Sequence, residues 1–390
     1  KSVSDEIKRK IILNRIDHRQ QPVILGTGIL PIGQHWEISL RQLGGRAVRM
    51  ALQDAGNPKP DAIYIGNGLG TILSHQANLG ALIPEFAGYP GIESCTFEAA
   101  GASGAAAFQA ACFAVESGYV DVAVALGVEK ITECEDRAAE AAMNLALNYE
   151  FESSQGSTVK TEAALIAQRY LYEWHLNREI FQKVALNSYQ NARENPNAFA
   201  RNIDEKTYQK QPLISAPLGL YDIAAQNDGA AAIVLTREEL VPAEERDRLI
   251  RVSGSGNAVA SLALHDRHDL LYWSAVAQSA AAALRQADLK LSDIDTFEIW
   301  DGTVMDVILS LESIGICQEG KGWQIDSLPL NITGGCLGRG NPLGASGMYQ
   351  IAEIARFLQT QKSKDRIHRN ALIQAIGGYG ATAITHILRS

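Results

Sequence analysis

The most regular pattern of apolar and polar positions lies between residues 98 and 130. A run of small residues from Ala99 to Ala107 leads into apolar positions at helical spacing, at Phe108, Cys112 and Val115. Ser117-Gly118 then acts as a stop signal, so we expect a buried helix that ends there. The next segment, from Val120 to Val128, is nearly all apolar, which is typical of a strand covered on both faces.

Strand and helix patterns alternate on the N-terminal side of this segment. Residues 21–32 predict a strand with a turn, and residues 39–56 predict an amphipathic helix. Further strands are expected at residues 61–68 and 93–97. This alternation predicts an α/β fold built from parallel crossover units.

The pattern changes between residues 131 and 217, where polar and aromatic residues dominate. A helix is predicted between the Asn177 cap and the Asn195-Pro196 stop. Residues 220–236 then return to a strand pattern. We therefore interpret residues 131–217 as an insertion that covers one face of the sheet.

The second part of the chain repeats the first. Gly101-Ala102-Ser103-Gly104 recurs at residues 344–347, Ala51-Leu52 recurs at residues 283–284, and Asn67-Gly68 has a counterpart in Asp301-Gly302. The same order at a nearly constant offset predicts a duplicated unit, with helix N-termini of both halves facing an interior site. The domains expected are residues 21–130 with 218–248, the insertion 131–217, and residues 249–390.

Composition limits the kinds of partner. The chain has 390 residues, 46% of them hydrophobic, and a formal net charge of -9, which argues against nucleic acid or an anionic membrane surface as a general partner. Its five cysteines form no CxxC pair, and an odd number favours a reducing compartment. Residues 1–20 show no signal-peptide core, and no apolar run is long enough to span a membrane. These features predict a cytoplasmic protein.

The segment around Gly101 resembles the nucleophile segment of the thiolase superfamily, above all its sterol-carrier-protein type. There a Cys-Ala-Ser-Gly opens the same Ala-rich helix and a Gly-Val-Glu-Lys, here residues 127–130, ends the next strand. The resemblance covers about residues 23–388, including the loop domain. It implies a five-layered α-β-α-β-α thiolase fold, usually a dimer, and a coenzyme A thioester as substrate, with no bound cofactor and no metal.

The resemblance also places the family's reactive residues on this sequence, and each of them differs. Gly101 stands at the nucleophilic cysteine, Asn341 at the histidine of Gly-His-Pro, and Trp300-Asp301 at the His-Asp pair. The C-terminal glycine turn, residues 376–380, carries Tyr379 and no preceding cysteine. Glycine has no side chain to attack with, so the acyl-enzyme reaction of a thiolase is not expected.

Each of these positions has an alternative interpretation. Asn341 can donate to an oxyanion but cannot act as a base, and Trp300 offers one N–H donor or is a core residue. Tyr379 is either a proton donor or a plug in the glycine turn. His265 and His268 form a catalytic pair or a solvated helix start. Cys336 and Cys95 are the candidates for a substitute thiol, although packing is the simpler role for both.

Three functional hypotheses remain open at this point. The first is aldol-type C–C bond cleavage or formation next to a coenzyme A thioester, with Tyr379, Asp301 and His265 as acid/base candidates and an oxyanion site of Gly101, Gly378, Asn341 and Trp300. The second is a non-catalytic subunit that binds acyl-CoA or lipid, or that scaffolds a partner. The third is an acyltransferase that uses Cys336.

Partners follow from the same resemblance. It is also suggestive of the thiolase-like steroid side-chain aldolases, which work with a small zinc-ribbon and OB-fold protein. A homodimer or heteromer is expected through the sheet edge beside residues 93–97, because that strand is too apolar to be left open to water.

Overall fold

The computed structural model describes residues 21–363 and 368–390, with side chains up to 361 and from 368. The prediction made for residues 1–20 therefore lies outside the described residues. Within the described ranges, no helix has both the length and the apolar character that crossing a bilayer requires.

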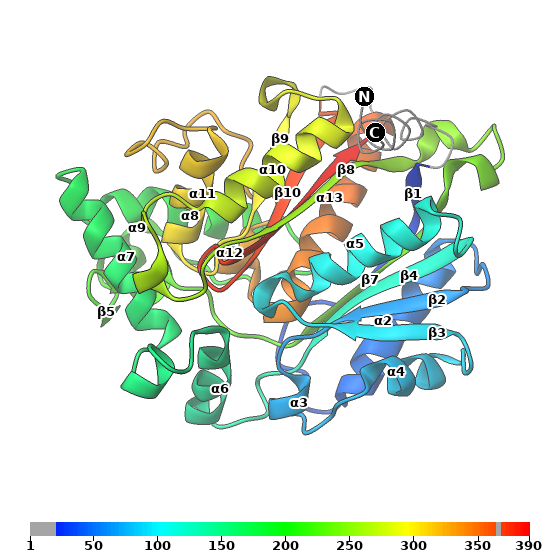
Figure 1. Ribbon diagram of the computed structural model, residues 1–390, viewed down its shortest axis with the longest axis horizontal. Coiled ribbons are helices and arrows are strands. Elements are labelled where there is room, and N and C mark those ends of the chain that lie inside the picture. Colours follow the sequence, from blue (N-terminus) through cyan, green and yellow to red (C-terminus); the bar gives the residue numbers. More distant parts are fainter. Residues whose placement is uncertain (1–20, 364–367) are drawn as a thin grey trace, which may run out of the picture.

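The first half of the chain forms one side of the molecule, blue to cyan in Figure 1. Its elements are β1 (Pro22–Ile29), α2 (Leu40–Asp54), β2 (Ala62–Gly66), α3 (Gly70–Leu73), α4 (Leu79–Ala87), β3 (Glu93–Phe97), η2 (Ala100–Ala102), α5 (Ser103–Glu116) and β4 (Val122–Glu129). Ser39 caps α2 in a reciprocal capping box with Gln42, which explains why the helix begins there. The predicted strands and helices of this half are present.

Between β4 and the next strand of the same sheet, β7 (Gly229–Arg237), the chain leaves the core. This segment contains α6 (Asp136–Met143), α7 (Val159–Glu173), α8 (Ile180–Ala192), α9 (Glu205–Gln209), β5 (Leu213–Ser215) and β6 (Leu218–Gly219). Asn177 Oδ1 accepts a hydrogen bond of 3.0 Å from Glu179 N just before α8, as a cap does. These helices lie on the side of the molecule away from β2 and β3 (Figure 1).

The second half repeats the arrangement of the first. It contains β8 (Ile250–Val259), α10 (Ser274–Ala287), β9 (Thr296–Ile299), α11 (Val304–Ile314), α12 (Gly335–Arg339), η10 (Leu343–Ala345), α13 (Ser346–Ser363), β10 (Asn370–Gly377) and β11 (Thr382–Arg389). Both Gly-Ala-Ser-Gly segments form a 3₁₀ turn that continues into a long helix, η2 into α5 and η10 into α13. The duplication predicted from the sequence is confirmed.

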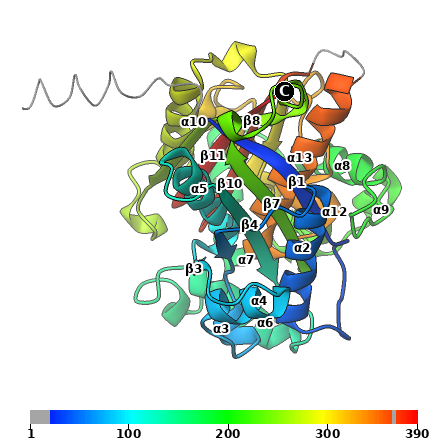
Figure 2. The same ribbon diagram turned by 90° about the vertical axis from the view of Figure 1, so that its right-hand side faces the viewer.

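The strands of both halves join in one nine-stranded sheet. Its order is β3-β2-β4-β7-β1-β8-β11-β10-β9, and Figure 2 shows β8, β1, β7 and β4 following one another across the middle of the molecule. β2 pairs in parallel with β3 and β4, and β10 with β9, whereas the central strands pair antiparallel. The two halves meet where Val23 and Ile24 of β1 pair with β8.

Three apolar clusters define the layers. Alternate residues of β4 face opposite sides: Ala123 and Ala125 belong to the cluster with α5 and α13, whereas Val124 and Leu126 belong to the cluster with α2 and α4. A third cluster packs α10 and α11 on the second half, together with α7 and α8. The two halves of the continuous sheet form the two strand layers. The helices α5 and α13 lie between them, with α2 and α4 outside one half and α10 and α11 outside the other, so the five-layered fold is confirmed.

The middle layer needs small residues because its two helices approach each other closely. A Cβ atom added to Gly104 would lie 2.8 Å from the Gly344 carbonyl oxygen, and one added to Gly347 would lie 3.1 Å from Ala105 N. This contact brings the helix starts of the two halves together. It fixes the position of the site described next.

Candidate active site

Backbone from three elements converges on Gly101. A Cβ atom on Gly101 would lie 2.5 Å from the Ile376 carbonyl oxygen at the end of β10 and 2.6 and 2.7 Å from ring carbons Cη2 and Cζ2 of Trp300, which follows β9. Real Cβ atoms do not tolerate such distances, so no side chain fits at position 101 in this arrangement. The indole of Trp300, 6% exposed, occupies the space that a residue 101 side chain would need.

Asn341 lies in the loop between α12 and η10, and η10 contacts η2. The Ser346 hydroxyl donates to Asn341 Oδ1 at 2.9 Å, and Asn341 N donates to the Ala225 carbonyl at 3.0 Å. Because the carbonyl end of the amide is held by Ser346, the Nδ2 group is the end left to donate to another oxygen.

Asp301 is fully buried and has several protein donors. Its carboxylate accepts from the Ser188 hydroxyl at 2.9 Å and from the backbone N–H groups of Cys336 and Leu337 at the start of α12. Burial raises the pKa of Asp301 to about 6, and these donors oppose the shift. The contacts tie the start of α12 and the side chain of Ser188 to the end of β9.

Tyr379 lies in the hairpin turn between β10 and β11. Three consecutive residues, Gly378, Tyr379 and Gly380, have φ angles of 56°, 42° and 74°, and Ala381 N donates to the Gly378 carbonyl at 2.8 Å. Positive φ at both central positions is the requirement of a type I′ turn, where a tyrosine is unusual. Its hydroxyl donates to the Val159 carbonyl at the start of α7, and burial raises the pKa of Tyr379 well above its usual value. The phenol therefore keeps its proton.

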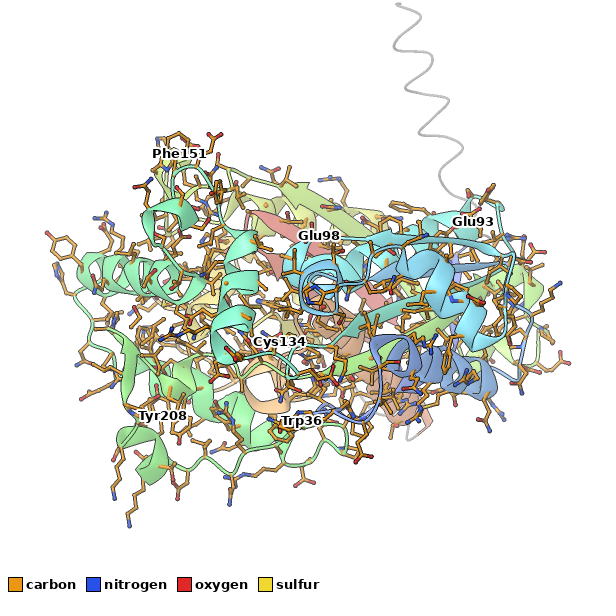
Figure 3. The ribbon with its side chains drawn as sticks, turned by 90° about the horizontal axis from the view of Figure 1, so that it is seen from below. Trp36, Glu93, Glu98, Cys134, Phe151 and Tyr208 are labelled. Atoms are coloured by element: carbon orange, nitrogen blue, oxygen red, sulfur yellow. The ribbon has the colours of Figure 1, made fainter. Side chains whose placement is uncertain are left out.

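His265 lies at the surface rather than among these residues. Its imidazole lies 3.5 Å from Asp266 Oδ1, and its ring centroid lies 5.0 Å from that of Phe151. Figure 3 shows Phe151 at the end of the molecule opposite to Glu93. The exposed position fits the interpretation of His265 as part of a solvated helix start.

The two cysteines considered as substitute nucleophiles have different surroundings. Cys336, for which packing was the simpler role, is fully buried on α12, and burial raises its pKa. Cys95 is exposed on β3, and its pKa is also raised by desolvation and by Glu93. Neither thiol has the lowered pKa of an activated nucleophile.

Glu129 links the two halves of the chain through hydrogen bonds. It was not among the site residues predicted from the sequence. Its carboxylate accepts from Gly68 N at 2.8 Å, Leu69 N at 3.1 Å, Asn67 Nδ2 at 2.8 Å and Gly344 N at 3.2 Å. Burial raises its pKa to about 7, and the four donors oppose the shift. The one signal for Glu129 in the sequence is its position as an acidic residue at the end of an otherwise apolar strand.

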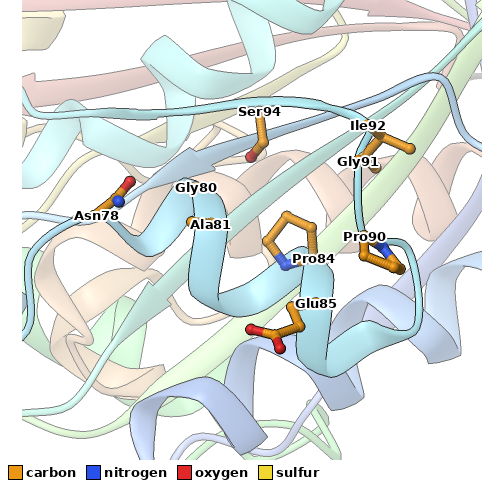
Figure 4. A pocket seen from close by; sticks show the side chains of 9 residues that line it. All are labelled: Asn78, Gly80, Ala81, Pro84, Glu85, Pro90, Gly91, Ile92 and Ser94. Carbon is orange, nitrogen blue, oxygen red and sulfur yellow. The ribbon is translucent and has the colours of Figure 1, made fainter.

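A surface hollow of about 460 Å³ lies elsewhere, between α4 and β3 (Figure 4). Asn78, Pro84, Glu85 and Ser94 are among its lining residues, and none of the predicted site residues is. Among the described residues, no group of three or more His, Cys, Asp or Glu side chains could hold a metal ion.

Comparison with protein families fits this arrangement. Residues 23–239 match the model described as "Thiolase, N-terminal domain", and residues 256–390 match "Thiolase C-terminal domain-like". The chain belongs to the thiolase family. Its members act on coenzyme A thioesters as acyltransferases or lyases, which establishes the acyl-CoA class of substrate for the family.

Individual relatives cover most of the chain. An acetyl-CoA acetyltransferase of Methanothermobacter thermautotrophicus is 33% identical over 93% of this chain and 98% of that protein. A 17-hydroxy-3-oxo-4-pregnene-20-carboxyl-CoA lyase of Mycobacterium tuberculosis is 27% identical over 87% of this chain and 92% of its own. The solved Ltp2-ChsH2(DUF35) aldolase superposes with a TM-score of 0.78 at 22% identity, covering 95% of this chain and 98% of that one. The relatives similar to this chain thus include both an acetyltransferase and a lyase.

Proposed function

We propose that this thiolase-family protein catalyses aldol-type C–C bond cleavage or formation next to a coenzyme A thioester, without a cysteinyl acyl-enzyme. The observation that carries the proposal is the closed space at Gly101. A thiolase nucleophile needs a side chain at this position, and the Trp300 ring together with the Ile376 carbonyl leaves no room for one. The 27% identical lyase relative supports a reaction of this class.

The remaining groups suit an enolate better than an acyl transfer. In retro-aldol cleavage a water molecule takes the β-hydroxyl proton and the Cα–Cβ bond breaks to give a carbonyl product. The electron pair of that bond forms the enolate of the acyl-CoA, whose carbon then takes up a proton, so no net proton is gained or lost. The Nδ2 group of Asn341 and the backbone N–H groups of the helix starts supply donors for the enolate oxygen. Tyr379 is the proposed proton donor; its hydroxyl donates to the Val159 carbonyl in this structure, so that hydrogen bond must break before the proton reaches the enolate.

The roles of the other candidates are narrower. Asp301 is proposed to position the α12 loop, because its oxygens are taken up by Ser188 and the backbone of that loop. Gly101 and Gly378 provide backbone next to the substrate, and Trp300 forms a wall of the site. His265 lies at the surface and is given no part in the proposed reaction. The relationship to the sterol-carrier-type branch stays a prediction.

The test is a retro-aldol assay with β-hydroxyacyl-CoA substrates, with detection of the released aldehyde or ketone. Wild-type protein is expected to cleave, and Tyr379→Phe is expected to lose at least about 10-fold in kcat, in the range of one general acid. Tyr272→Phe, at an exposed tyrosine, is the matched control. Cleavage untouched by Tyr379→Phe would overturn the role of Tyr379. Absence of cleavage, with acyl-CoA binding intact, would favour the non-catalytic subunit.

We also propose a dimer through β3. This strand is one end of the described sheet, where it pairs with β2 on one side, so the row of backbone groups on its other side is open. Two aromatic side chains after β3 in the chain are also exposed: Phe113, on α5, is 50% exposed, and Tyr119, just beyond α5, is 69% exposed. A small zinc-ribbon and OB-fold partner is proposed in addition, supported by the DUF35 component of the similar aldolase.

Sedimentation at micromolar concentration checks the dimer. We expect Thr96→Lys, at an exposed position of β3, to give a monomer, because a lysine on an edge strand opposes pairing. Gln53→Lys on the outer face of α2 is the control and should leave the dimer intact. A wild-type monomer would contradict the proposed interface.

A further inference from the structure

The turn that carries Tyr379 has a backbone conformation that is rare for a tyrosine and needs stabilising contacts. Of the central residues, Gly380 adopts positive φ readily, but Tyr379 at φ 42° is not glycine, asparagine or aspartate. Such outliers persist only when surrounding contacts determine them. The structure shows one side chain that makes several of these contacts, Arg267.

Arg267 binds four carbonyl groups from two segments. Its Nη1 donates to the Tyr379 carbonyl at 2.6 Å, and its Nη2 donates to the Gly378 carbonyl at 3.3 Å. On the other side, Nε donates to the Ser261 carbonyl at 3.0 Å and Nη2 to the Leu262 carbonyl at 3.2 Å. The guanidinium therefore links the turn to residues 261–262 with a planar set of donors that a lysine cannot reproduce.

Two glutamates, Glu152 and Glu162, interact with this guanidinium, and burial together with Glu152 raises the pKa of Glu162 to about 7 while Arg267 lowers it. Burial lowers the pKa of Arg267, whereas Glu152 and Glu162 raise it. Both glutamates are almost fully buried, at 6% and 2% exposure. Glu152 also accepts from Leu264 N at 2.6 Å and from Asn148 N at 2.9 Å, so it holds the segment of Arg267 against the region before α7.

The same assembly reaches the hydroxyl end of Tyr379. That hydroxyl donates to the carbonyl of Val159, the first residue of α7, and Glu162 lies in the first turn of this helix. Arg267 thus binds the backbone carbonyl of Tyr379, and the first residue of α7 binds its hydroxyl. The same helix carries Glu162, which interacts with Arg267. Both ends of the tyrosine depend on one set of contacts.

We propose that Arg267 is a positioning residue, which holds Tyr379 in its left-handed conformation and so directs the phenol of Tyr379. The inference rests on the proposed role of Tyr379 as proton donor. Arg267 does not contact the reacting atoms; it acts through the backbone of the turn. Its effect therefore appears in kcat, whereas KM for the acyl-CoA changes little.

The experiment compares Arg267→Ala, Arg267→Lys and wild type. We expect kcat to fall at least about 10-fold in both variants with KM changed less than about 3-fold, and guanidinium ion at millimolar concentration to restore part of the activity of Arg267→Ala. Arg137→Ala, at an exposed arginine of α6, is the matched control and should keep wild-type kcat. A kcat equal to that of wild type in both variants, or no guanidinium rescue, would overturn the proposal.

A second measurement does not depend on activity. Amide hydrogen exchange at Ala381, whose N–H closes the turn, should be at least about 10-fold faster in Arg267→Ala and slower again with guanidinium. Unchanged exchange would overturn the positioning role even if the aldol reaction were established. If wild type has no lyase activity, the proposed function fails, and exchange at Ala381 still decides the role of Arg267. Arg267→Lys keeps the positive charge, so it tests the role should Arg267→Ala not fold.

Discussion

At the scale of single residues, the decisive pair is Gly101 and Trp300. Their contact makes them interdependent, because a side chain at position 101 requires a smaller residue at position 300. Replacing Gly101 by Cys together with Asn341 by His, which restores a nucleophile and a base, therefore does not by itself restore a thiolase site. The wall formed by Trp300 must change as well.

We expect Gly101→Cys alone to be destabilised by about 1–3 kcal/mol, because the new side chain overpacks the site, and to give no acyl adduct. The triple variant Gly101→Cys, Trp300→His, Asn341→His should regain stability and become acylated at residue 101. Intact-mass measurement after incubation with acetyl-CoA checks both. Acylation of the single variant with wild-type stability would contradict the packing argument, and an adduct on wild-type Cys336 would revive the acyltransferase hypothesis.

At the scale of elements, the loop that carries Asn341 depends on a buried ion pair. Arg339 Nη1 donates to Glu353 Oε2 of α13 at 2.8 Å, and both side chains are almost fully buried. The guanidinium also lies over the Tyr349 ring, 5.5 Å from its centroid. These contacts hold α12 against α13, and Asn341 follows two residues after Arg339.

We expect Arg339→Met to cost about 3–5 kcal/mol of unfolding free energy, because it leaves the Glu353 carboxylate buried without its cation. Urea titration measures the loss. The matched control is Arg169→Met, whose partner Glu173 is 2.6 Å away but exposed, and which should cost at most about 1 kcal/mol. Equal losses in the two variants would contradict the distinction between buried and exposed pairs.

At the scale of the whole molecule, buried carboxyl groups determine the dependence of stability on pH. Burial raises the pKa of Glu129 to about 7, of Asp306 to about 7 and of Glu298 to about 8. The folded protein therefore binds these protons more tightly than the unfolded chain does. Between the ordinary pKa of a carboxyl group and the raised values, unfolding releases protons, so stability falls as the pH rises.

We expect the midpoint of thermal unfolding to decrease from about pH 5 to about pH 8. Glu298→Gln removes one of these groups while keeping its size, so its decrease over the same range should be smaller. Glu319→Gln, at an exposed position, serves as the control and should behave as wild type does. A midpoint that rises with pH across this range would contradict the assignment of buried, protonated carboxyl groups.

The sequence alone determined the class of fold and the duplicated plan. The strand of residues 122–129 is apolar on both faces because helices cover both, and the cap at Ser39 fixes the start of α2 through contacts three residues apart. Patterns of this kind are local or periodic, so they can be read along the chain. The repeated Gly-Ala-Ser-Gly segments likewise indicated two equivalent helix starts.

Only the tertiary structure decided which atoms the candidate site residues contact. Gly101 and Trp300 are far apart in sequence, and nothing near either residue shows that the indole fills the space above the glycine. Arg267 reaches the Tyr379 carbonyl across 112 residues, and Asp301 accepts a hydrogen bond from the backbone N–H of Cys336, 35 residues later. Contacts of this kind form only when β9, β10 and the two helix starts pack together. Because they join residues far apart in the chain, the pattern of apolar and polar positions does not show them. The sequence determined which elements form, and the packing of these elements decided which atoms are in contact.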